Sequence, residues 1–444
     1  MKNFLSALYF SRNFWVVLIV LVVGYVWAYI FPVLWPLMNI ALILGLVFTA
    51  ADIYILFRIR QGIFARRHVP ERLSNGDDNP VTIFLENNYA FKINIEVVDE
   101  IPHQFQRRDV LFLTKMAPGA QQQIHYELRP VQRGTYDFGK INVFVSSPLR
   151  LLMRRYRFDQ HQVVPVYPSF LQMRQFSLLA VANRLNEVGV KRIRQVGQSM
   201  EFDQVRGYVF GDDPRAVNWK ATARQGDVMV NSYQDSRQQP VYCLIDKGRV
   251  MQSPFDGLTL LDYAINAALV LSNIALMKDD KAGLITFADK IGQTVPADRR
   301  SGQLQKLLEV LYHQKTIFPE TDFERLASTV RYHIRQRSLL LLFTNFETLE
   351  ALQRQLPYLR RMARNHMLVV IFFENTETKE LVSQPAANVE ALYLKTIAGR
   401  FQYEKKRILA ELRTYGIQAI YTPPQQLSVN TINKYLELKA RGVI

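Results

Sequence analysis

The chain has 444 residues, of which 49% are hydrophobic, so it is long enough for two or three domains with sizeable buried cores. Lys and Arg number 55 against 39 Asp and Glu, and the formal net charge of +16 favours anionic partners: nucleic acid, anionic lipid or an acidic protein face. The one cysteine, Cys243, excludes an intramolecular disulfide, and its position in an apolar run indicates a buried core residue rather than a thiol nucleophile.

The N-terminal residues predict a transmembrane hairpin of two helices within 13–58, after a short N-terminus at 1–12. Residues 14–31 have no charge and residues 37–57 have one, Asp52, so each run approaches or exceeds the roughly 20 apolar residues that cross a bilayer. A cleavable signal peptide would instead have an apolar core of about 7–15 residues, followed by a small-residue cleavage site.

The charges around this hairpin predict its orientation. Lys2 and Arg12 precede the first span and several Arg residues follow the second, whereas the break between the spans has no Lys or Arg. The positive-inside rule therefore predicts a multi-pass protein with the lipid bilayer as a partner and both termini in the cytoplasm. We expect Asp52 to reach for water or for Arg58 near the membrane interface rather than to relay protons.

A β-rich module is predicted at 80–168, after a basic linker at 59–79. Short alternating runs bounded by Pro, Gly, Asn or Asp predict about six or seven strands in this module. The pattern is typical of a small all-β sandwich of immunoglobulin-like shape, which would serve as a spacer or a binding module. Its histidines are scattered and have neither metal-ligand nor triad spacing.

The segment 240–444 alternates between apolar runs of strand length and longer stretches with helical periodicity. This alternation predicts an α/β domain with a mostly parallel, doubly wound sheet. Ligands of such sheets bind at the carboxyl ends of the strands. We therefore expect functional side chains in the loops at 244–251, 318–327 and 341–347.

These three loops resemble those of a von Willebrand factor A domain, in which an Asp-x-Ser-x-Ser loop, a Thr and a further Asp hold a divalent cation. The resemblance implies that Asp246, Thr321 and Asn345 stand at metal-ligand positions. Gly248 and Val250 stand where the two serines would be, and neither has a side-chain oxygen for a hard cation such as magnesium.

The same loop also has too little negative charge to neutralise a divalent cation, because Lys247 and Arg249 lie beside its single carboxylate. We therefore expect a degenerate site that does not function with magnesium, and no cofactor. In that case Asp246 caps a helix or pairs with Arg249.

The linking segment at 169–239 contains the most distinctive motif of the chain, EFDQVRGYVFGDDPRAVNWKATARQGDVMVNSY at 201–233. With this motif, nearly the whole chain resembles the bacterial domain-of-unknown-function-58 family, often described as MoxR-associated. The resemblance implies a protein of the bacterial inner (cytoplasmic) membrane that accompanies a MoxR-type AAA+ ATPase. It rests on Glu201, Phe202, Arg206, Tyr208, Gly211, Asp212, Arg215, Asn218, Trp219, Ala223 and Arg224.

Within the motif, the Gly-Asp-Asp-Pro run at 211–214 predicts a tight turn, because Gly permits it and Pro fixes φ. We expect one of its two carboxylates to accept hydrogen bonds from Arg215 or Arg224, and Trp219 to supply buried area beneath the turn. The motif would then be an ion-paired elbow between the two modules.

These features favour a non-enzymatic, membrane-anchored adaptor or scaffold. Its cytoplasmic A-type domain would bind a protein partner, such as a MoxR-type AAA+ ATPase that acts in envelope or stress-related remodelling. The sequence has no phosphate-binding loop, no zinc-ligand spacing and no nucleophile–base pair. A hydrolase using Asp212 and Asp213 is less favoured, because adjacent carboxylates on a Pro-bounded turn diverge and no His lies nearby.

Basic surfaces leave a second alternative, the binding of anionic lipid or nucleic acid. A solvated helix face is the favoured explanation of such clusters, so we expect no nucleic-acid partner, and the sequence identifies no small-molecule substrate. The clusters are Lys191, Arg192 and Arg194; Arg354, Arg360, Arg361 and Arg364; and Lys405, Lys406 and Arg407.

Overall fold

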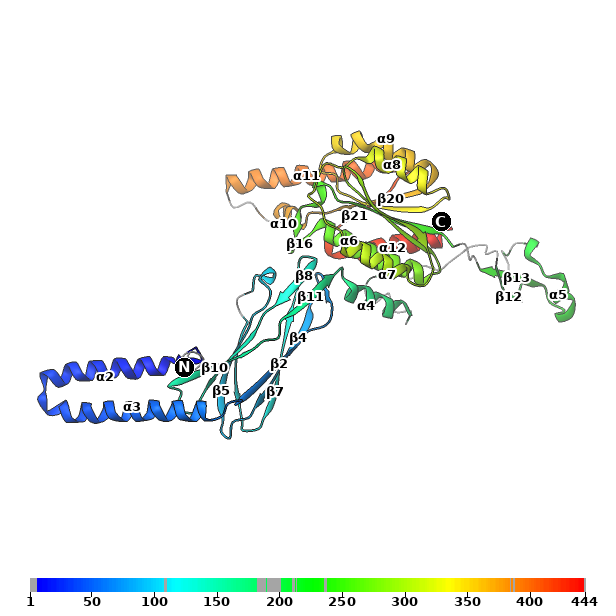
Figure 1. The fold of residues 1–444 in the computed structure, drawn as a ribbon. Coiled ribbons are helices and arrows are strands. Elements are labelled where there is room, and N and C mark those ends of the chain that lie inside the picture. Colours follow the sequence, from blue (N-terminus) through cyan, green and yellow to red (C-terminus); the bar gives the residue numbers. More distant parts are fainter. Residues whose placement is uncertain are drawn as a thin grey trace. The chain divides into compact units, whose positions relative to one another are not determined.

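The computed structural model describes residues 6–107, 110–181, 189, 201–209, 212, 214–234, 238–383, 385 and 388–442. The chain forms two compact units, Met1–Tyr167 and Pro168–Ile444. The first contains a pair of long N-terminal helices and many short strands, and the second contains an α/β sheet (Figure 1).

Two apolar helices, α2 (Arg12–Ile30) and α3 (Trp35–Arg58), form a hairpin joined by the 3-10 turn η1 (Pro32–Leu34) (Figure 1). The hydroxyl of Ser11 caps α2 by accepting the N–H of Asn13 at 3.2 Å. Mean hydropathies of 2.1 and 2.4 confirm that both helices are long and apolar enough to span a membrane. Helix α6 (Leu260–Met277) also reaches 1.6, but it is buried in the core of the second unit.

The strands of the first unit form three sheets. One has the order β1-β10-β9-β5-β6, from Leu8–Phe10, Leu152–Phe158, Ile141–Ser146, Ile93–Asp99 and Leu111–Met116. The others have the orders β2-β4-β7, from Ile63–His68, Asn79–Asn87 and Gln121–Leu128, and β3-β11-β8, from Leu73–Ser74, Gln162–Tyr167 and Gly134–Phe138. One hydrophobic core draws Ile83 from β4, Ile95 from β5 and Val143 from β9, so two of these sheets share it.

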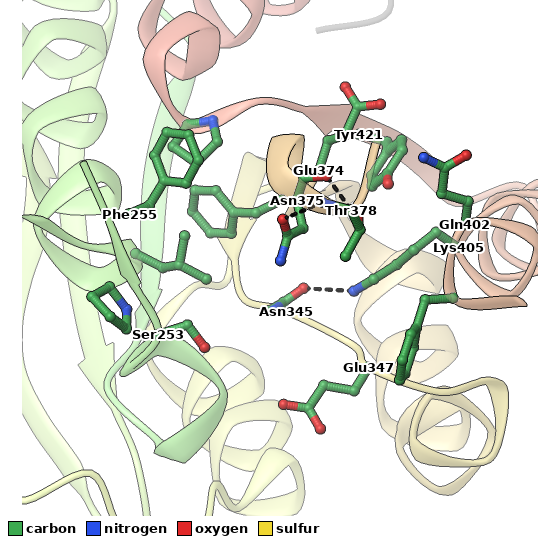
Figure 2. A pocket seen from close by; sticks show the side chains of 15 residues that line it. Ser253, Phe255, Asn345, Glu347, Glu374, Asn375, Thr378, Gln402, Lys405 and Tyr421 are labelled. Carbon is green, nitrogen blue, oxygen red and sulfur yellow. Dashed lines mark hydrogen bonds between the residues drawn. The ribbon is translucent and has the colours of Figure 1, made fainter. Parts of the chain in front are cut away.

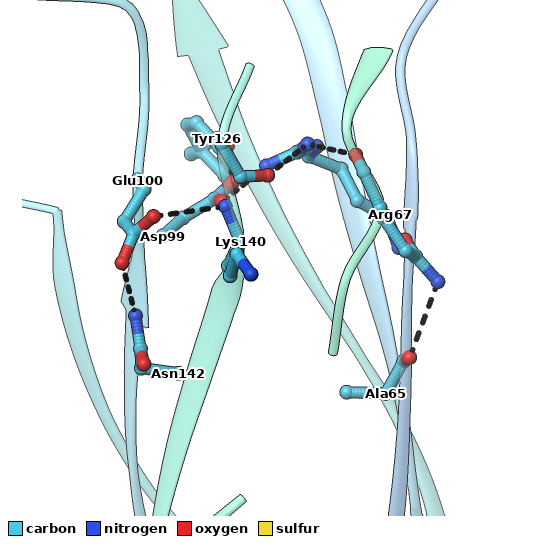
Figure 3. A network of polar contacts seen from close by, with 9 residues as sticks. Ala65, Arg67, Asp99, Glu100, Tyr126, Lys140 and Asn142 are labelled. Atoms are coloured by element: carbon cyan, nitrogen blue, oxygen red, sulfur yellow. Dashed lines mark hydrogen bonds and ion pairs between the residues drawn. The ribbon is translucent and has the colours of Figure 1, made fainter. Parts of the chain in front are cut away.

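Strand β2 lies within residues 59–79, where the sequence indicates a basic linker. Its side chains alternate between buried and exposed, and Arg67 is among the buried ones. Arg67 makes an ion pair with the buried Asp99 at 2.5 Å and donates to the carbonyl oxygens of Gly139 and Gln160 at 2.9 and 2.8 Å (Figure 3). A buried arginine in a basic run hides the period-two pattern by which a strand is predicted.

The carboxylate of Asp99 also accepts the hydroxyl of Tyr126 (Figure 3). Burial raises the pKa of Asp99 above its usual range, although the Arg67 guanidinium acts in the opposite direction. The network ties β2 to β5 and β7, and its partners satisfy a charge that would otherwise be costly to bury.

The C-terminal turn of α3 is fixed to strand β10. The carboxylate of Asp52 accepts the backbone N–H groups of Leu151 and Leu152 at 3.1 and 2.9 Å, so it reaches neither for water nor for Arg58 as the sequence led us to expect. Arg154 donates to the carbonyl oxygens of Leu56 and Ile59, each at 2.6 Å, and so satisfies carbonyls that a helix end leaves without partners.

Strand β1 precedes the hairpin in the sequence, whereas β10 follows it. The two strands pair antiparallel, with Leu8 opposite Arg154 and Phe10 opposite Leu152. The segments before and after α2 and α3 therefore belong to one sheet.

The second unit has a six-stranded sheet with the order β18-β17-β14-β19-β20-β21. Five strands are parallel, and β18 is antiparallel at one edge, which confirms a mostly parallel sheet. The chain leaves β14 towards β17 and later returns to β19 on the other side of β14, so the order reverses between β14 and β19. The strands are Ile291–Asp298, Lys281–Phe287, Pro240–Asp246, Leu339–Phe343, Met367–Phe373 and Gln418–Thr422.

Helices cover both faces of this sheet (Figure 1). One core packs side chains of α8 (Phe323–His333), α9 (Leu349–Asn365) and α11 (Val389–Thr414) against alternate residues of the strands. On the other face α6 contacts α4 (Phe170–Val181), α7 (Gln303–Tyr312) and α12 (Leu427–Ala440). Helix α10 (Thr376–Ser383) packs on α11, and the ribbon β15-β16 (Pro254–Phe255 and Leu258–Thr259) precedes α6.

Cys243 lies in the middle of β14 and faces α6, with its Sγ 4.0 Å from the carbonyl oxygen of Ala268. Burial raises the pKa of its thiol to about 12. A neutral, enclosed thiol is a core residue and a poor nucleophile.

Candidate functional site

Asp246 ends β14 at the carboxyl edge of the sheet, and its side chain is fully buried. Its Oδ1 accepts the hydroxyl of Thr321 at 2.8 Å and the N–H of Gly248 at 2.7 Å. Its Oδ2 accepts the hydroxyl of Thr344 at 2.7 Å. Burial raises the pKa of this carboxyl to about 6, even though all three hydrogen bonds lower it.

The three loops singled out from the sequence thus meet at this carboxylate. Thr321 is a partner, as the resemblance implies, but the partner from the third loop is Thr344 rather than its neighbour Asn345. Among the described residues Asp246 makes no ion pair with Arg249 and instead accepts the three donors. The signal for Thr344 was its place directly after β19: because Phe343 lies opposite Ile245 in β14, Thr344 comes next to Asp246.

The residues gathered here do not fit a magnesium ion, which needs about six oxygen ligands. A Cβ on Gly248 would lie 1.8 Å from the Thr321 hydroxyl, so that hydroxyl fills the space a serine would use. The amide oxygen of Asn345 accepts the ammonium of Lys405 at 2.9 Å, which puts a cation where a second metal ligand would be. In the part of the chain that the structure describes, no group of three His, Cys, Asp or Glu side chains could hold an ion.

A cavity of about 320 Å³ lies at the same edge of the sheet, over the ends of β19, β20 and β21 (Figure 2). One wall is the loop between β14 and α6, and the other is α11. Such a crevice at the carboxyl edge of a parallel sheet is where α/β proteins bind ligands. Its lining residues are Ser253, Pro254, Phe255, Leu260, Asn345, Glu347, Phe373, Glu374, Asn375, Thr378, Phe401, Gln402, Lys405, Tyr421 and Pro424.

Lys405 reaches from α11 into this cavity (Figure 2). Its ammonium donates to Asn345 Oδ1 and to the carbonyl oxygen of Phe346, and it lies 5.7 Å from the centre of the Phe372 ring. Burial lowers the pKa of this lysine to about 8, partly offset by the Glu347 carboxylate. Sequence reasoning placed Lys405 in a basic surface cluster, because nothing local distinguishes it from Lys406.

The family motif forms a separate arm, a ribbon of β12 (Glu201–Gly207) and β13 (Met229–Gln234) joined through η4 (Pro214–Ala216) and α5 (Trp219–Gln225). Asp212 does pair with an arginine, but with Arg206 rather than Arg215 or Arg224. The two nitrogens of Arg206 lie 2.7 and 2.8 Å from the two carboxylate oxygens, and the N–H of Val209 donates to Asp212 at 2.9 Å. These contacts hold the pKa of Asp212 below its usual range.

Trp219 is not buried beneath the turn, because its side chain is 74% exposed. It opens α5, where the side chain of Asn218 accepts the N–H of Ala221 at 3.0 Å and donates to Asn231 at 2.8 Å. Arg224 and Tyr208 are also exposed.

Several motif and cluster positions lie outside the described residues. These are Gly211 and Asp213, the side chains of Glu201, Phe202 and Arg215, and the basic cluster Lys191, Arg192 and Arg194.

The central part of the chain is similar to known proteins. The family model described as "Protein of unknown function DUF58" matches residues 204–390. The uncharacterized protein YeaD of Bacillus subtilis (strain 168) is 26% identical over 205 residues, which are 44% of this chain and 50% of that protein. The chain thus spans about half the length of this curated relative.

Solved structures resemble the chain only loosely. Proximal thread matrix protein 1 of the mussel byssus has a TM-score of 0.27 and 11% identity, and covers 46% of this chain and 47% of that one. The PapD-like domain 7 of human CEP192 has a TM-score of 0.18 and 12% identity, and covers 24% of this chain and 83% of that one. Similarity at this level carries no argument about function.

Proposed function

We propose that this chain, whose residues 204–390 belong to the DUF58 family, is a non-enzymatic, membrane-anchored adaptor that docks a protein partner in the cytoplasm. The observation that carries the proposal is the exposure of Trp219 in the family motif. Burying an aromatic ring of this size in an interface contributes about 2–3 kcal/mol, and Trp is enriched at the centres of such interfaces. The partner we propose is a MoxR-type AAA+ ATPase, in accordance with the family resemblance.

The surroundings of Trp219 support a docking role. Other exposed apolar side chains of the arm are Tyr208, Val209 and Val228, at 39%, 61% and 46%. The exposed cations Lys220 and Arg224 lie on α5 with the tryptophan, so the surface suits an apolar patch with an acidic rim. The Arg206–Asp212 pair and the Asn218 cap hold this surface in place, which reduces the entropy lost on binding.

The first unit supports the role of a membrane anchor. Because β1 and β10 pair across the hairpin, both flanks of α2 and α3 lie on one side of a membrane that these helices cross. The flanking Lys and Arg residues favour the cytoplasmic side of the bacterial inner membrane. We propose an immunoglobulin-like sandwich for the strands that follow and a von Willebrand factor A-like fold for the α/β unit, in which no metal is used.

The pairing of Asp212 also favours an adaptor over a hydrolase. Both oxygens of its carboxylate are occupied by the Arg206 guanidinium, and the pair keeps the carboxylate ionised, so it neither gives nor takes a proton near neutral pH.

The test is capture of a purified MoxR-type ATPase by the full chain in lipid nanodiscs. Replacing Trp219 with Ala should weaken capture at least about tenfold, because an interface anchor is lost. Tyr332 on α8 is equally exposed, at 74%, and Tyr332→Ala is the matched control, which should leave capture unchanged. The proposal fails if the wild-type chain captures no ATPase, or if both variants weaken capture alike.

A further inference from the structure

We propose that the cavity beside Lys405 is a binding site for a compact apolar group that carries a carboxylate, and that the lysine ammonium, not a metal ion, receives this carboxylate. The proposal goes beyond the adaptor function, since it concerns a different surface from the motif arm. The ligand chemistry has two sources, a free organic acid or the C-terminal residue of a peptide.

The polar groups of the cavity are suited to a carboxylate. Two of the three N–H groups of Lys405 donate to Asn345 Oδ1 and to the carbonyl oxygen of Phe346. Among the described residues the third N–H group has no assigned acceptor. Asn375 accepts the N–H of Thr378 through Oδ1 at 3.1 Å, and its amide extends into the cavity (Figure 2). The ammonium and this amide approach the same space from α11 and from the end of β20.

The two acidic residues of the lining do not occupy the ammonium. Glu374 is paired with Lys379 at 3.1 Å, and its carboxylate points out of the cavity (Figure 2). Glu347 is exposed at the rim, and its carboxylate is directed away from Lys405 (Figure 2). The positive charge inside the cavity is therefore open to an incoming anion, and a charge-assisted hydrogen bond is strongest in such a partly desolvated place.

The walls define the rest of the ligand. The lining includes the apolar or aromatic side chains of Phe255, Leu260, Phe373, Phe401 and Tyr421, so much of the enclosed space is apolar. A volume of about 320 Å³ is at the small end of the usual range for ligand pockets, and it suits a group the size of one aromatic residue. Sugars and nucleotides are disfavoured, because their many polar groups would be left without partners.

The experiment is isothermal titration of the full chain in nanodiscs of zwitterionic lipid. The probes are 3-phenylpropionate, its uncharged analogue 3-phenylpropanol, and a pentapeptide ending in Phe with a free or an amidated C-terminus. We expect the free acid or the free-carboxylate peptide to bind, and the two uncharged counterparts to bind at least about tenfold more weakly. The same affinity is expected with magnesium and with a chelator.

Three variants separate the site from general effects. Lys405→Met removes the charge and keeps most of the side-chain length, and it should weaken binding at least about tenfold. Lys406→Met, which changes the exposed neighbour on the same helix, should leave binding unchanged. Phe255→Trp keeps the lysine and fills the cavity, so it should also weaken binding.

The outcomes are distinct. Binding of the free acid alone identifies a small-molecule ligand, and binding of the peptide alone identifies a protein terminus; either result supports the site. The proposal is overturned if no carboxylate probe binds, if Lys406→Met weakens binding as much as Lys405→Met, or if binding requires magnesium. Loss of ATPase capture by Trp219→Ala is measured separately, so the two proposals fail independently.

Discussion

The buried carboxylate of Asp246 makes the stability of the α/β unit depend on pH. Its pKa is about 6 in the folded chain and 3.8 when exposed, so the folded state binds the proton more tightly. Stability therefore falls as the pH rises from about 4 to 6 and stays lower above that range. Asp246→Asn removes this charge and keeps an acceptor for Thr321 and Gly248.

We accordingly expect Asp246→Asn to raise the thermal unfolding midpoint at pH 7.5, by up to the equivalent of about 3 kcal/mol, and by much less at pH 4.5. Thermal unfolding of the wild-type and variant chains at both pH values measures this. Magnesium should leave the wild-type midpoint unchanged. An equal shift at both pH values would show that the carboxylate is not desolvated as the structure indicates.

Single residues were predicted best where topology and resemblance agreed. The loops of Asp246 and Thr321 were expected to meet because strand ends share one edge of a parallel sheet, and the resemblance to a von Willebrand factor A domain singled out the two residues. The partner of Asp212 was missed, since three arginines of the motif are equivalent in sequence and only the turn places Arg206 opposite the carboxylate. Lys405 was missed because it comes from a helix some sixty residues beyond Asn345, and pattern reasoning gives no such contact.

The stability of the contact between α3 and β10, called the joint below, should depend on the acceptor oxygens of Asp52. Asp52→Ala leaves the N–H groups of Leu151 and Leu152 unpaired in a buried place, which costs about 1–3 kcal/mol for each group. Asp52→Asn keeps an acceptor oxygen and should lose less of the free energy of unfolding than Asp52→Ala. Thermal unfolding and limited proteolysis of the two variants in nanodiscs measure the difference; equal behaviour of both would mean that these bonds do not stabilise the joint.

Helices and strands were predicted from sequence where their own pattern carries the signal. The two N-terminal helices and the buried parallel strands have such patterns: the helices are long and apolar enough to span a membrane, and the core surrounds the strands. Strand β2 was hidden by Arg67, and β18, at the edge of its sheet, has few buried positions. Helix α11 spans Val389–Thr414, and the apolar side chains of its first turns, among them Val389 and Tyr393, are exposed, so no core contact marks where it begins.

The direction in which the hairpin crosses the membrane can be tested by labelling with a membrane-impermeant maleimide. In intact spheroplasts Val33→Cys, in the exposed turn between α2 and α3, should be labelled. Lys406→Cys should be labelled only after permeabilisation. The native Cys243 contributes no background, because it is buried and its thiol has a pKa of about 12. Labelling of Lys406→Cys in intact spheroplasts would reverse the orientation that we propose.

The order of modules along the chain was available from the sequence, because membrane spans, alternating strands and α/β repeats differ in period. The pairing of strands was not. Residues of β1 carry no signal for a partner beyond the hairpin, and a three-residue strand is too short for its pattern to be recognised. Contacts between distant segments depend on the whole folded sheet rather than on local preference.

The pairing of β1 with β10 also requires a delay during synthesis between the appearance of the two strands. Phe10 leaves the ribosome roughly 140 residues before its partner Leu152, which at about 5–20 residues per second is a delay on the order of ten seconds. In the topology that we propose, both spans enter the bilayer during that time and return the nascent chain to the side on which β1 lies. In a chain that inserts only one span, β10 would lie on the opposite side of the membrane from β1, and the sheet would keep an open edge. Quality-control proteases and chaperones recognise such an edge. In the topology that we propose, closure of this sheet therefore requires that both spans have been inserted.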